Sequence, residues 1–341
     1  MVHAEGSEAT AGLNPLFERL FAWVETTAVM AAAEVGLPDV LAAGPQGAEA
    51  VASQLGAEPD AVARLLRILA GAGIVAGAGD GRFSLTDHGS SLRSDVPGSL
   101  RAGYRMMGGP MSRALLAGDV AVCSAGTTAF EGVLGVPIWD YMAAHPADAA
   151  VFNDAMVNFG ATVGMPAIDA YDFSWVHRLV DVGGGLGQLA LEVLRRTPSA
   201  RAVVYDTPPV AADARAAIEA AGLADRCEAM GGDFLESVPD GDCHTLRFIV
   251  HFLPDDLAVR LLTNCRKALD PAGRLLLFEL VVPADDEAHL ARAVDWIMLT
   301  CPGGRERTAT EYATLLAHAG FQLQRVIPSA GPLSVLEAVP L

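Results

Sequence analysis

The sequence predicts an α/β protein, with a mostly parallel sheet covered by helices and a largely helical region before it. Two observations carry this prediction. From Val176 onward, strand-like and helix-like segments alternate, which is typical of a parallel sheet. Before about Leu100, apolar residues recur at helical spacing and only one short strand segment follows. We expect three regions: residues 1–100, 101–172 and 173–341.

The first region, residues 1–100, has the outline of a winged helix. The stretches AEAVASQLG and PDAVARLLRILAGAGIV carry apolar residues at helical spacing, and GAGDGRFSLTDHG supplies a wing. Such domains often bind DNA, but this one contains 12 acidic and 5 basic side chains. A protein that contacts phosphates needs the opposite charge. We therefore expect a dimerisation role, and a winged-helix regulator that senses a small molecule is the less favoured alternative.

Bulk composition narrows the class of protein. The formal net charge of −18 makes nucleic acid and anionic membrane surfaces poor partners. The apolar run near Ala22–Leu37 contains Glu25 and Glu34, so no membrane span is expected. The N-terminus lacks the pattern of a secretory signal. The cysteine count is odd and the spacing irregular, which suits reduced thiols in a cytoplasmic protein; the five are Cys123, Cys227, Cys243, Cys265 and Cys301.

The second region, residues 101–172, is expected to be a helical linker that contributes to a substrate pocket. Methionines recur along it, from Met106 to Met165. Methionine fills irregular gaps and adaptable binding surfaces, although a packed helical core explains most single positions equally well.

In the third region, residues 173–341, a glycine turn follows the first strand. The turn DVGGGLG runs from Asp181 to Gly187, where a ligand can approach the backbone and the following helix N-terminus. Asp206 ends the second strand, where a carboxylate can bind both ribose hydroxyls. Gly185, Gly187 and Ala190 also satisfy the looser dinucleotide form G-x-G-x-x-A. The turn alone therefore leaves an NAD-linked oxidoreductase open.

Two further features favour S-adenosylmethionine over NAD. The stretch GGDFL places Asp233 and Phe234 after the third strand, a carboxylate for an adenine amino group beside a ring for its face. The C-terminal FQLQRVIPSAGPLSVLEAVP has only a turn between its two strands, which predicts an antiparallel hairpin on the sheet edge. Most dinucleotide-binding sheets lack that ending.

From about Asn14 to the C-terminus, the sequence resembles the S-adenosylmethionine-dependent small-molecule O-methyltransferases. The similar types are the plant caffeate/flavonoid and bacterial polyketide-tailoring enzymes. The matching motifs are LVDVGGGLG, YDTPPV, GDFLESVP, NCRKALDPAGRLLLFE, FNDAM, and PGGRERT after AVDWIML. The resemblance implies a Rossmann-like class I methyltransferase sheet behind a winged-helix domain that joins two chains as a homodimer.

The resemblance also implies roles for individual residues. His251 falls on the position of the general base, and Glu279 and Glu306 fall on its acidic partners. Residues at cofactor positions are Asp181, Gly183, Gly185, Gly187, Asp206, Asp233, Phe234 and Arg247. Residues at substrate positions are Met156, Phe159 and Met298, and Phe252, which follows the base, is also expected to bind substrate.

One departure concerns the residues after the histidine. The family usually reads His-Asp-Trp, whereas Phe252 and Leu253 follow His251 here. The change leaves C- or N-methylation, or a non-methylating reaction on the same fold, as alternatives to O-methylation. No tight cluster of metal-ligand residues with ligand spacing appears, so we expect no metal.

Overall fold

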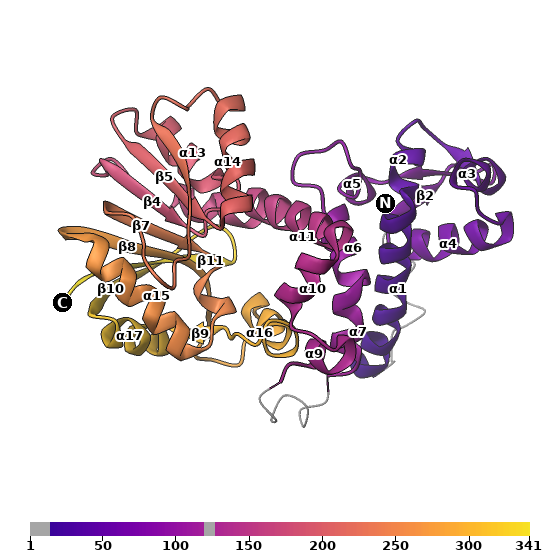
Figure 1. The fold of residues 1–341 in the computed structure, drawn as a ribbon. Helices are drawn as coiled ribbons and strands as arrows, with labels where there is room; N and C mark the ends of the chain where they lie inside the picture. The colour runs from indigo at the N-terminus through magenta and orange to yellow at the C-terminus, as the bar shows by residue number, and fades with distance from the viewer. Residues whose placement is uncertain (1–13, 119–126) are drawn as a thin grey trace. The chain divides into compact units, whose positions relative to one another are not determined.

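The computed structural model describes residues 14–118 and 127–341, so Cys123 and the N-terminal stretch lie outside the described residues. The chain divides into two compact units (Figure 1). The first comprises Met1–Ser112 with Ala147–Asn158, and the second Arg113–Pro146 with Phe159–Leu341.

The first unit begins with the long helix α1 (Pro15–Val35). Asn14 caps it by accepting the Leu16 N–H at 2.9 Å, and Gly36 ends it in the left-handed conformation at φ 75°. A small antiparallel sheet in the order β1-β3-β2 forms the wing. The predicted winged-helix domain is confirmed. The unit's other elements are α2 (Leu37–Leu41), β1 (Gln46–Gly47), α3 (Ala48–Leu55), α4 (Pro59–Gly71), β2 (Val75–Gly77), β3 (Arg82–Leu85), α5 (Asp87–Ser90), α6 (Arg101–Gly108) and most of α11 (Pro146–Phe159).

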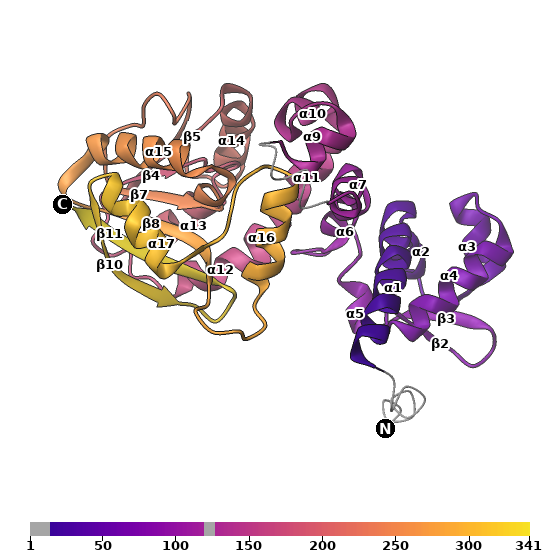
Figure 2. The ribbon, with the colours of Figure 1, turned by 90° about the horizontal axis from the view of Figure 1, so that it is seen from below.

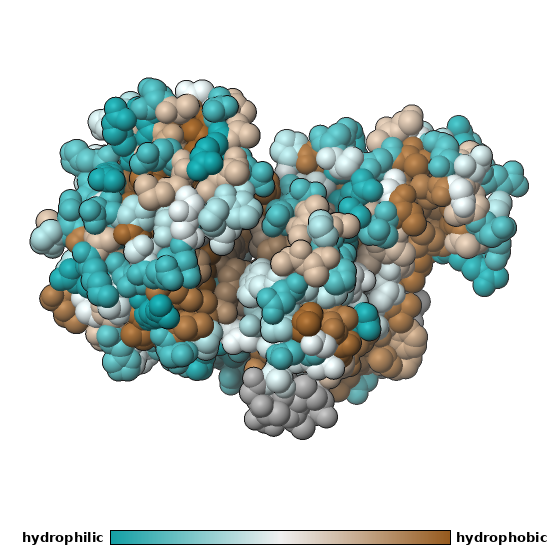
Figure 3. Space-filling view, in the orientation of Figure 1, coloured by the Kyte–Doolittle hydropathy of each residue, from teal (hydrophilic) through white to brown (hydrophobic). Residues whose placement is uncertain are grey.

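Helix α1 buries only a few small residues and leaves large apolar side chains exposed. Brown surface gathers over the first unit where α1 lies in the ribbon view (Figure 3). An apolar patch of this kind marks an interaction surface more often than a solvated one. The exposed side chains are Leu16, Phe17, Leu20, Phe21, Trp23 and Val24.

The second unit is built on a sheet in the order β10-β11-β8-β7-β4-β5-β6, with β9 beside β8 (Figures 1 and 2). Strands β4 to β8 pair in parallel, whereas β11 pairs antiparallel with both β8 and β10. The predicted C-terminal hairpin is therefore confirmed. The strands are β4 (Arg178–Val182), β5 (Arg201–Asp206), β6 (Cys227–Gly231), β7 (Gly241–Arg247), β8 (Leu269–Val282), β9 (Arg307–Thr308), β10 (Phe321–Pro328) and β11 (Leu333–Pro340).

Both faces of the sheet are covered because successive side chains of each strand point to opposite sides. On β5, Val204 joins the core beneath α13 (Gln188–Arg196) and α14 (Pro208–Ala220). Its neighbour Val203 joins the core beneath α15 (Asp255–Ala268) and α17 (Ala309–His318). The layers cover both faces of the sheet, and ligands in open α/β sheets bind at the strand ends.

Short helices complete the second unit. They are α7 (Pro110–Leu116), which overlaps the unit boundary, α9 (Ala129–Leu134), α10 (Ile138–Ala144), a π-helical turn (Gly160–Gly164), α12 (Met165–Asp169), a 3₁₀ turn (Val250–Phe252) and α16 (Leu290–Thr300). Across the described ranges, no helix combines the length and apolar character that a membrane crossing requires.

Candidate active site

The predicted base and its two predicted acidic partners lie together. His251 sits on the 3₁₀ turn that follows β7, and its Nδ1 is 2.6 Å from Oε1 of Glu306. Glu306 immediately precedes β9, which pairs with the carboxyl-terminal part of β8, the strand that carries Glu279. All three side chains are buried, with His251 only 4% exposed. The imidazole and the carboxylates thus form one enclosed polar cluster.

Glu279 holds the turn that carries His251 rather than the His251 ring itself. Its Oε1 accepts the backbone N–H groups of Ile249 at 3.1 Å and Val250 at 2.9 Å. Its Oε2 has no hydrogen-bond partner among the described residues, and the same is true of His251 Nε2. A buried polar atom without a partner is costly, so these atoms are positioned for a group that arrives from outside.

Arg307 ties the two sides of the cluster together. Its guanidinium donates to the carbonyls of Val250 at 3.2 Å and Leu253 at 3.0 Å, and to Oδ1 of Asp255 at 2.6 Å. The side chain is almost fully buried. Sequence analysis did not single out Arg307, although it lies in the PGGRERT motif beside Glu306.

Burial sets the protonation of the cluster. It lowers the pKa of His251, which the nearby charge of Glu279 partly opposes. Burial also raises the pKa values of Glu279 and Glu306. At neutral pH the imidazole is therefore uncharged. With Nδ1–H donated to Glu306, the lone pair on Nε2 is available to accept a proton.

The same three residues meet a geometric requirement for metal binding. One ligand atom from each of His251, Glu279 and Glu306 lies within 4.8 Å of the others. Linear spacing did not reveal this grouping because the residues come from a turn, a strand and a loop. The absence of ligand spacing in the sequence is therefore not an argument against a metal here.

The predicted cofactor turn lies at the carboxyl ends of β4 and β5. Gly183 and Gly185 have φ of 68° and 57°, and a Cβ at Gly183 would lie 2.4 Å from Cδ1 of Ile249. Only glycine fits this conformation and this approach. Asp206 accepts the N–H of Gly185 at 2.9 Å and of Thr207 at 2.7 Å, which fixes the turn against the end of β5.

Two buried charges flank this turn. Asp181 accepts the Thr245 hydroxyl at 2.9 Å through Oδ1, but its Oδ2 has no partner among the described residues. Burial raises the pKa of Asp181, and the charge of Arg247 opposes the rise. Arg247 donates Nη2 to Gln188 at 3.2 Å, while its Nη1 has no described partner. A ligand with both an ammonium and a carboxylate would satisfy the two orphaned atoms. Sequence analysis missed Gln188.

Asp233 and Phe234 follow β6, as predicted. Asp233 accepts the Leu235 N–H at 2.8 Å, and Asn264 donates to the Phe234 carbonyl at 3.1 Å. The Phe234 ring packs on the core beneath α15 and α17. These contacts hold the loop at the same sheet edge as Asp206.

The predicted substrate residues are divided between the units. Met156 lies in the part of α11 that belongs to the first unit, whereas Phe159 ends that helix in the second. Met298 is buried on α16. Phe252 adjoins the base, with ring centroids 4.3 Å apart.

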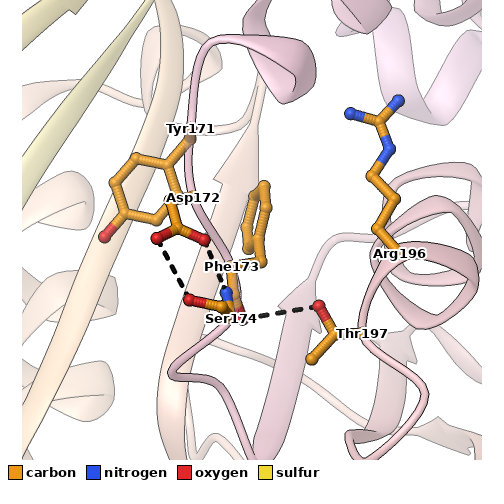
Figure 4. Close-up of a pocket in the computed structure, with 6 residues that line it drawn as sticks. All are labelled: Tyr171, Asp172, Phe173, Ser174, Arg196 and Thr197. Carbon is orange, nitrogen blue, oxygen red and sulfur yellow. Dashed lines mark hydrogen bonds between the residues drawn. The ribbon is translucent and has the colours of Figure 1, made fainter.

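A small cavity of about 180 Å³ lies elsewhere (Figure 4). Its lining residues Tyr171–Ser174 precede β4, and Arg196 and Thr197 precede β5. It therefore opens at the amino edge of the sheet, opposite the cofactor turn. Arg196 is already paired with Asp169 and Glu192, so the cavity offers no unpaired cation to an anion.

Comparison with known proteins defines the class. Residues 116–322 match the O-methyltransferase domain model, and residues 17–95 match the O-methyltransferase dimerisation domain model. The chain belongs to the O-methyltransferase family. It uses S-adenosylmethionine as its cofactor, and the NAD-linked alternative is wrong.

Three similar proteins illustrate the family's range. The phenazine O-methyltransferase of Lysobacter antibioticus is 38% identical over 94% of this chain and 93% of its own length. An 8-amino-8-demethylriboflavin N,N-dimethyltransferase of Streptomyces davaonensis is 34% identical over 90% and 89%. The crystal structure of a methyltransferase in calicheamicin biosynthesis, in its S-adenosylhomocysteine-bound form, matches with a TM-score of 0.81 at 33% identity and covers 100% of both chains.

Proposed function

We propose that this enzyme methylates a hydroxyl group of an aromatic or polyketide-type natural product, with His251 as the general base. The observation that carries the proposal is the 2.6 Å contact between His251 Nδ1 and Glu306, which leaves Nε2 of the same ring without a described partner. An imidazole held in this way has a fixed tautomer and one basic nitrogen to offer.

The chemistry accounts for each member of the cluster. Bound S-adenosylmethionine supplies an electrophilic methyl group, so the protein must align the acceptor oxygen and remove its proton. Transfer from a phenol of pKa about 10 to an imidazole of ordinary pKa, about 6.5, is uphill by roughly 5 kcal/mol, and the lowered pKa of His251 makes it more so. Glu306 stabilises the imidazolium that forms, and Glu279 keeps the turn of His251 in place. When methyl and proton transfer are concerted, the phenolate does not form fully, which lowers the energetic cost of proton transfer further.

The cofactor residues divide by chemistry. Asp181 Oδ2 and Arg247 Nη1 suit the ammonium and carboxylate of the amino-acid part, and this assignment is supported by the lack of a described partner for either atom. Asp206 accepts hydrogen bonds from the ribose hydroxyls. Asp233 accepts one from the adenine amino group, and the Phe234 ring lies against the adenine face. The backbone of Gly183, Gly185 and Gly187 gives the cofactor room. The acceptor is contacted by Met156, Phe159, Phe252 and Met298. Because the methyl group of the cofactor is already electrophilic, catalysis needs no metal.

The first region, residues 1–100, forms a homodimer through α1 and its neighbours in a cytoplasmic enzyme. The apolar side chains exposed along α1 support this interface. Residues 101–172 contribute to the substrate pocket, and residues 173–341 form the catalytic domain.

The deciding experiment compares His251→Ala with wild type, using S-adenosylhomocysteine release in the presence of candidate phenols and calorimetry for cofactor affinity. Loss of the base should lower kcat by about 10²–10⁴-fold, the usual contribution of general acid–base catalysis. Cofactor affinity should stay within about twofold because the residue lies outside the glycine turn. His318→Ala, at an exposed position on α17, is the matched control. Full activity in His251→Ala would exclude the base role.

N-methylation is the second candidate function, because one relative with 34% identity is named as an N,N-dimethyltransferase. An amine acceptor also loses a proton, so His251 could serve either reaction. Mass spectrometry of the product with acceptors that carry both a hydroxyl and an amino group distinguishes them: a new methyl on oxygen supports the principal proposal.

A further inference from the structure

A row of aromatic rings leads from the surface of the second unit to the base. Trp139, on α10, meets Phe252 edge to face, with ring centroids 5.4 Å apart and planes at 90°. Phe252 lies 4.3 Å from the His251 ring, and Phe248 lies 5.4 Å from the same ring. Exposure falls along the row, from 44% at Trp139 through the half-buried Phe252 to 4% at His251.

The row is held in place by the backbone around it. Phe248 has φ of 57°, a conformation that is strained for a bulky side chain and that persists where surrounding structure enforces it. Gly304 packs directly on the backbone of Phe252, because a Cβ there would lie 2.8 Å from the Phe252 Cα. These contacts fix the backbone that carries Phe248 and Phe252, and the rings of Trp139, Phe252 and Phe248 form a wall beside His251.

Among the described residues, the groups beside the wall offer little to an anion: burial raises the pKa values of Glu279 and Glu306, and Arg247 is assigned to the cofactor carboxylate. Glu279 and Glu306 face the base. Of the neighbouring cations, Arg307 is engaged by Asp255 at 2.6 Å, and Arg305 by Glu311 at 3.1 Å. A carboxylate on an acceptor would lose its hydration here and would not gain an unpaired guanidinium from Arg305 or Arg307 in return.

We propose that Trp139 and Phe252 select acceptors by charge and shape, favouring a neutral, planar fused-ring hydroxyl compound over one that carries a ring carboxylate. Flat aromatic faces suit edge-to-face and offset contacts with the two rings. The hydroxyl of such an acceptor is then directed along the row to Nε2 of His251. This inference rests on the proposed function and assigns a specificity role to Trp139, a residue that the sequence motifs did not indicate.

The test compares two acceptors that differ only by a ring carboxylate, 2-naphthol and 6-hydroxy-2-naphthoate. Their affinities for the full-length protein are measured by fluorescence with S-adenosylhomocysteine present, so that binding is observed without turnover. We expect wild type to bind 2-naphthol at least tenfold more tightly. Trp139→Leu and Phe252→Leu should each weaken 2-naphthol binding at least fivefold and reduce the preference, whereas Trp139→Phe should restore most of it.

His145→Ala, at the C-cap of the same helix and outside the row, is the control and should match wild type. Unchanged S-adenosylhomocysteine affinity shows that each variant is folded. Equal or tighter binding of the carboxylate, no binding of either compound, or wild-type 2-naphthol affinity in both leucine variants would overturn the inference. Methyl transfer is assayed separately: selective binding of 2-naphthol without methylation under any condition counts against the proposed function and leaves the selectivity intact.

Discussion

The carboxylate of Asp295 accepts a hydrogen bond from the backbone N–H of Glu306 at 2.8 Å. Asp295 lies on α16, the helix that also carries Met298, so this contact joins a proposed substrate helix to Glu306, the proposed acidic partner of His251. Asp295 also acts through its charge. Burial is the main reason that the pKa of Glu306 is raised, and the neighbouring negative charge of Asp295 raises it further.

Asp295→Asn should therefore shift the acid limb of the pH profile to lower pH. The asparagine oxygen still accepts the Glu306 N–H, but the negative charge is gone, so Glu306 ionises more readily and the cluster stays competent at lower pH. Asp295→Ala removes the acceptor as well and should lower kcat. The measurement is kcat/KM against pH, with Asp286→Asn in the exposed loop before α16 as control. An acid limb that stays fixed or moves to higher pH in Asp295→Asn would contradict this role.

Arg307 gives a prediction about stability. Arg307→Lys keeps the charge but loses the planar fork that reaches two carbonyls and Asp255 together. The Leu253 carbonyl would lose its described partner, whereas the Val250 carbonyl would keep only the Leu253 N–H. We expect a loss of about 2–4 kcal/mol in the free energy of unfolding, together with a lower kcat because the His251 turn loosens. Urea denaturation and steady-state kinetics measure the two effects.

The matched control for Arg307 is Arg305→Lys. Arg305 is half exposed, and its ion pairs with Asp255 and Glu311 lie at the surface, where such pairs contribute little. If Arg307→Lys proved as stable as Arg305→Lys, the buried guanidinium would not be what holds the turn.

Sequence patterns were sufficient to predict the layered sheet because each strand and helix has its own local pattern of apolar residues, as in the apolar strand before DVGGGLG. They also placed His251 at a strand end, where open sheets bind ligands. They could not predict the roles of Asp295 and Trp139, since both residues act through contacts with residues distant in the chain. The resemblance implied that Glu279 and Glu306 flank His251, but only the structure shows that one ligand atom of each lies within 4.8 Å of the others.

Acid stability should depend on His244, a residue outside the proposed chemistry. It is fully buried on β7, and burial lowers its pKa to about 4. Because the unfolded pKa is near 6.5, the unfolded chain binds an extra proton between these values, and stability falls as pH drops below 6.5. The expected loss between pH 7 and pH 5 is roughly 2 kcal/mol.

The variant His244→Leu should remove this part of the pH dependence, whereas His318→Leu at the surface should not. Urea midpoints at pH 7 and pH 5 provide the comparison, and only the difference from wild type matters because the His251 cluster titrates too. An identical pH dependence in His244→Leu and wild type would show that His244 is not the titrating group.

Cofactor binding should depend on a glycine in the π-helical turn. A Cβ at Gly164 would lie 2.8 Å from Nη1 of Arg247, the atom without a described partner, so Gly164→Ala must displace the guanidinium. If that atom binds the cofactor carboxylate, affinity for S-adenosylhomocysteine should fall by about tenfold, the equivalent of one charge-assisted hydrogen bond. Gly71→Ala, at the end of α4, adds a Cβ that meets open space and serves as control. If calorimetry finds the same affinity for S-adenosylhomocysteine in Gly164→Ala, Gly71→Ala and wild type, Arg247 does not bind the cofactor. Its charge would then only balance that of Asp181.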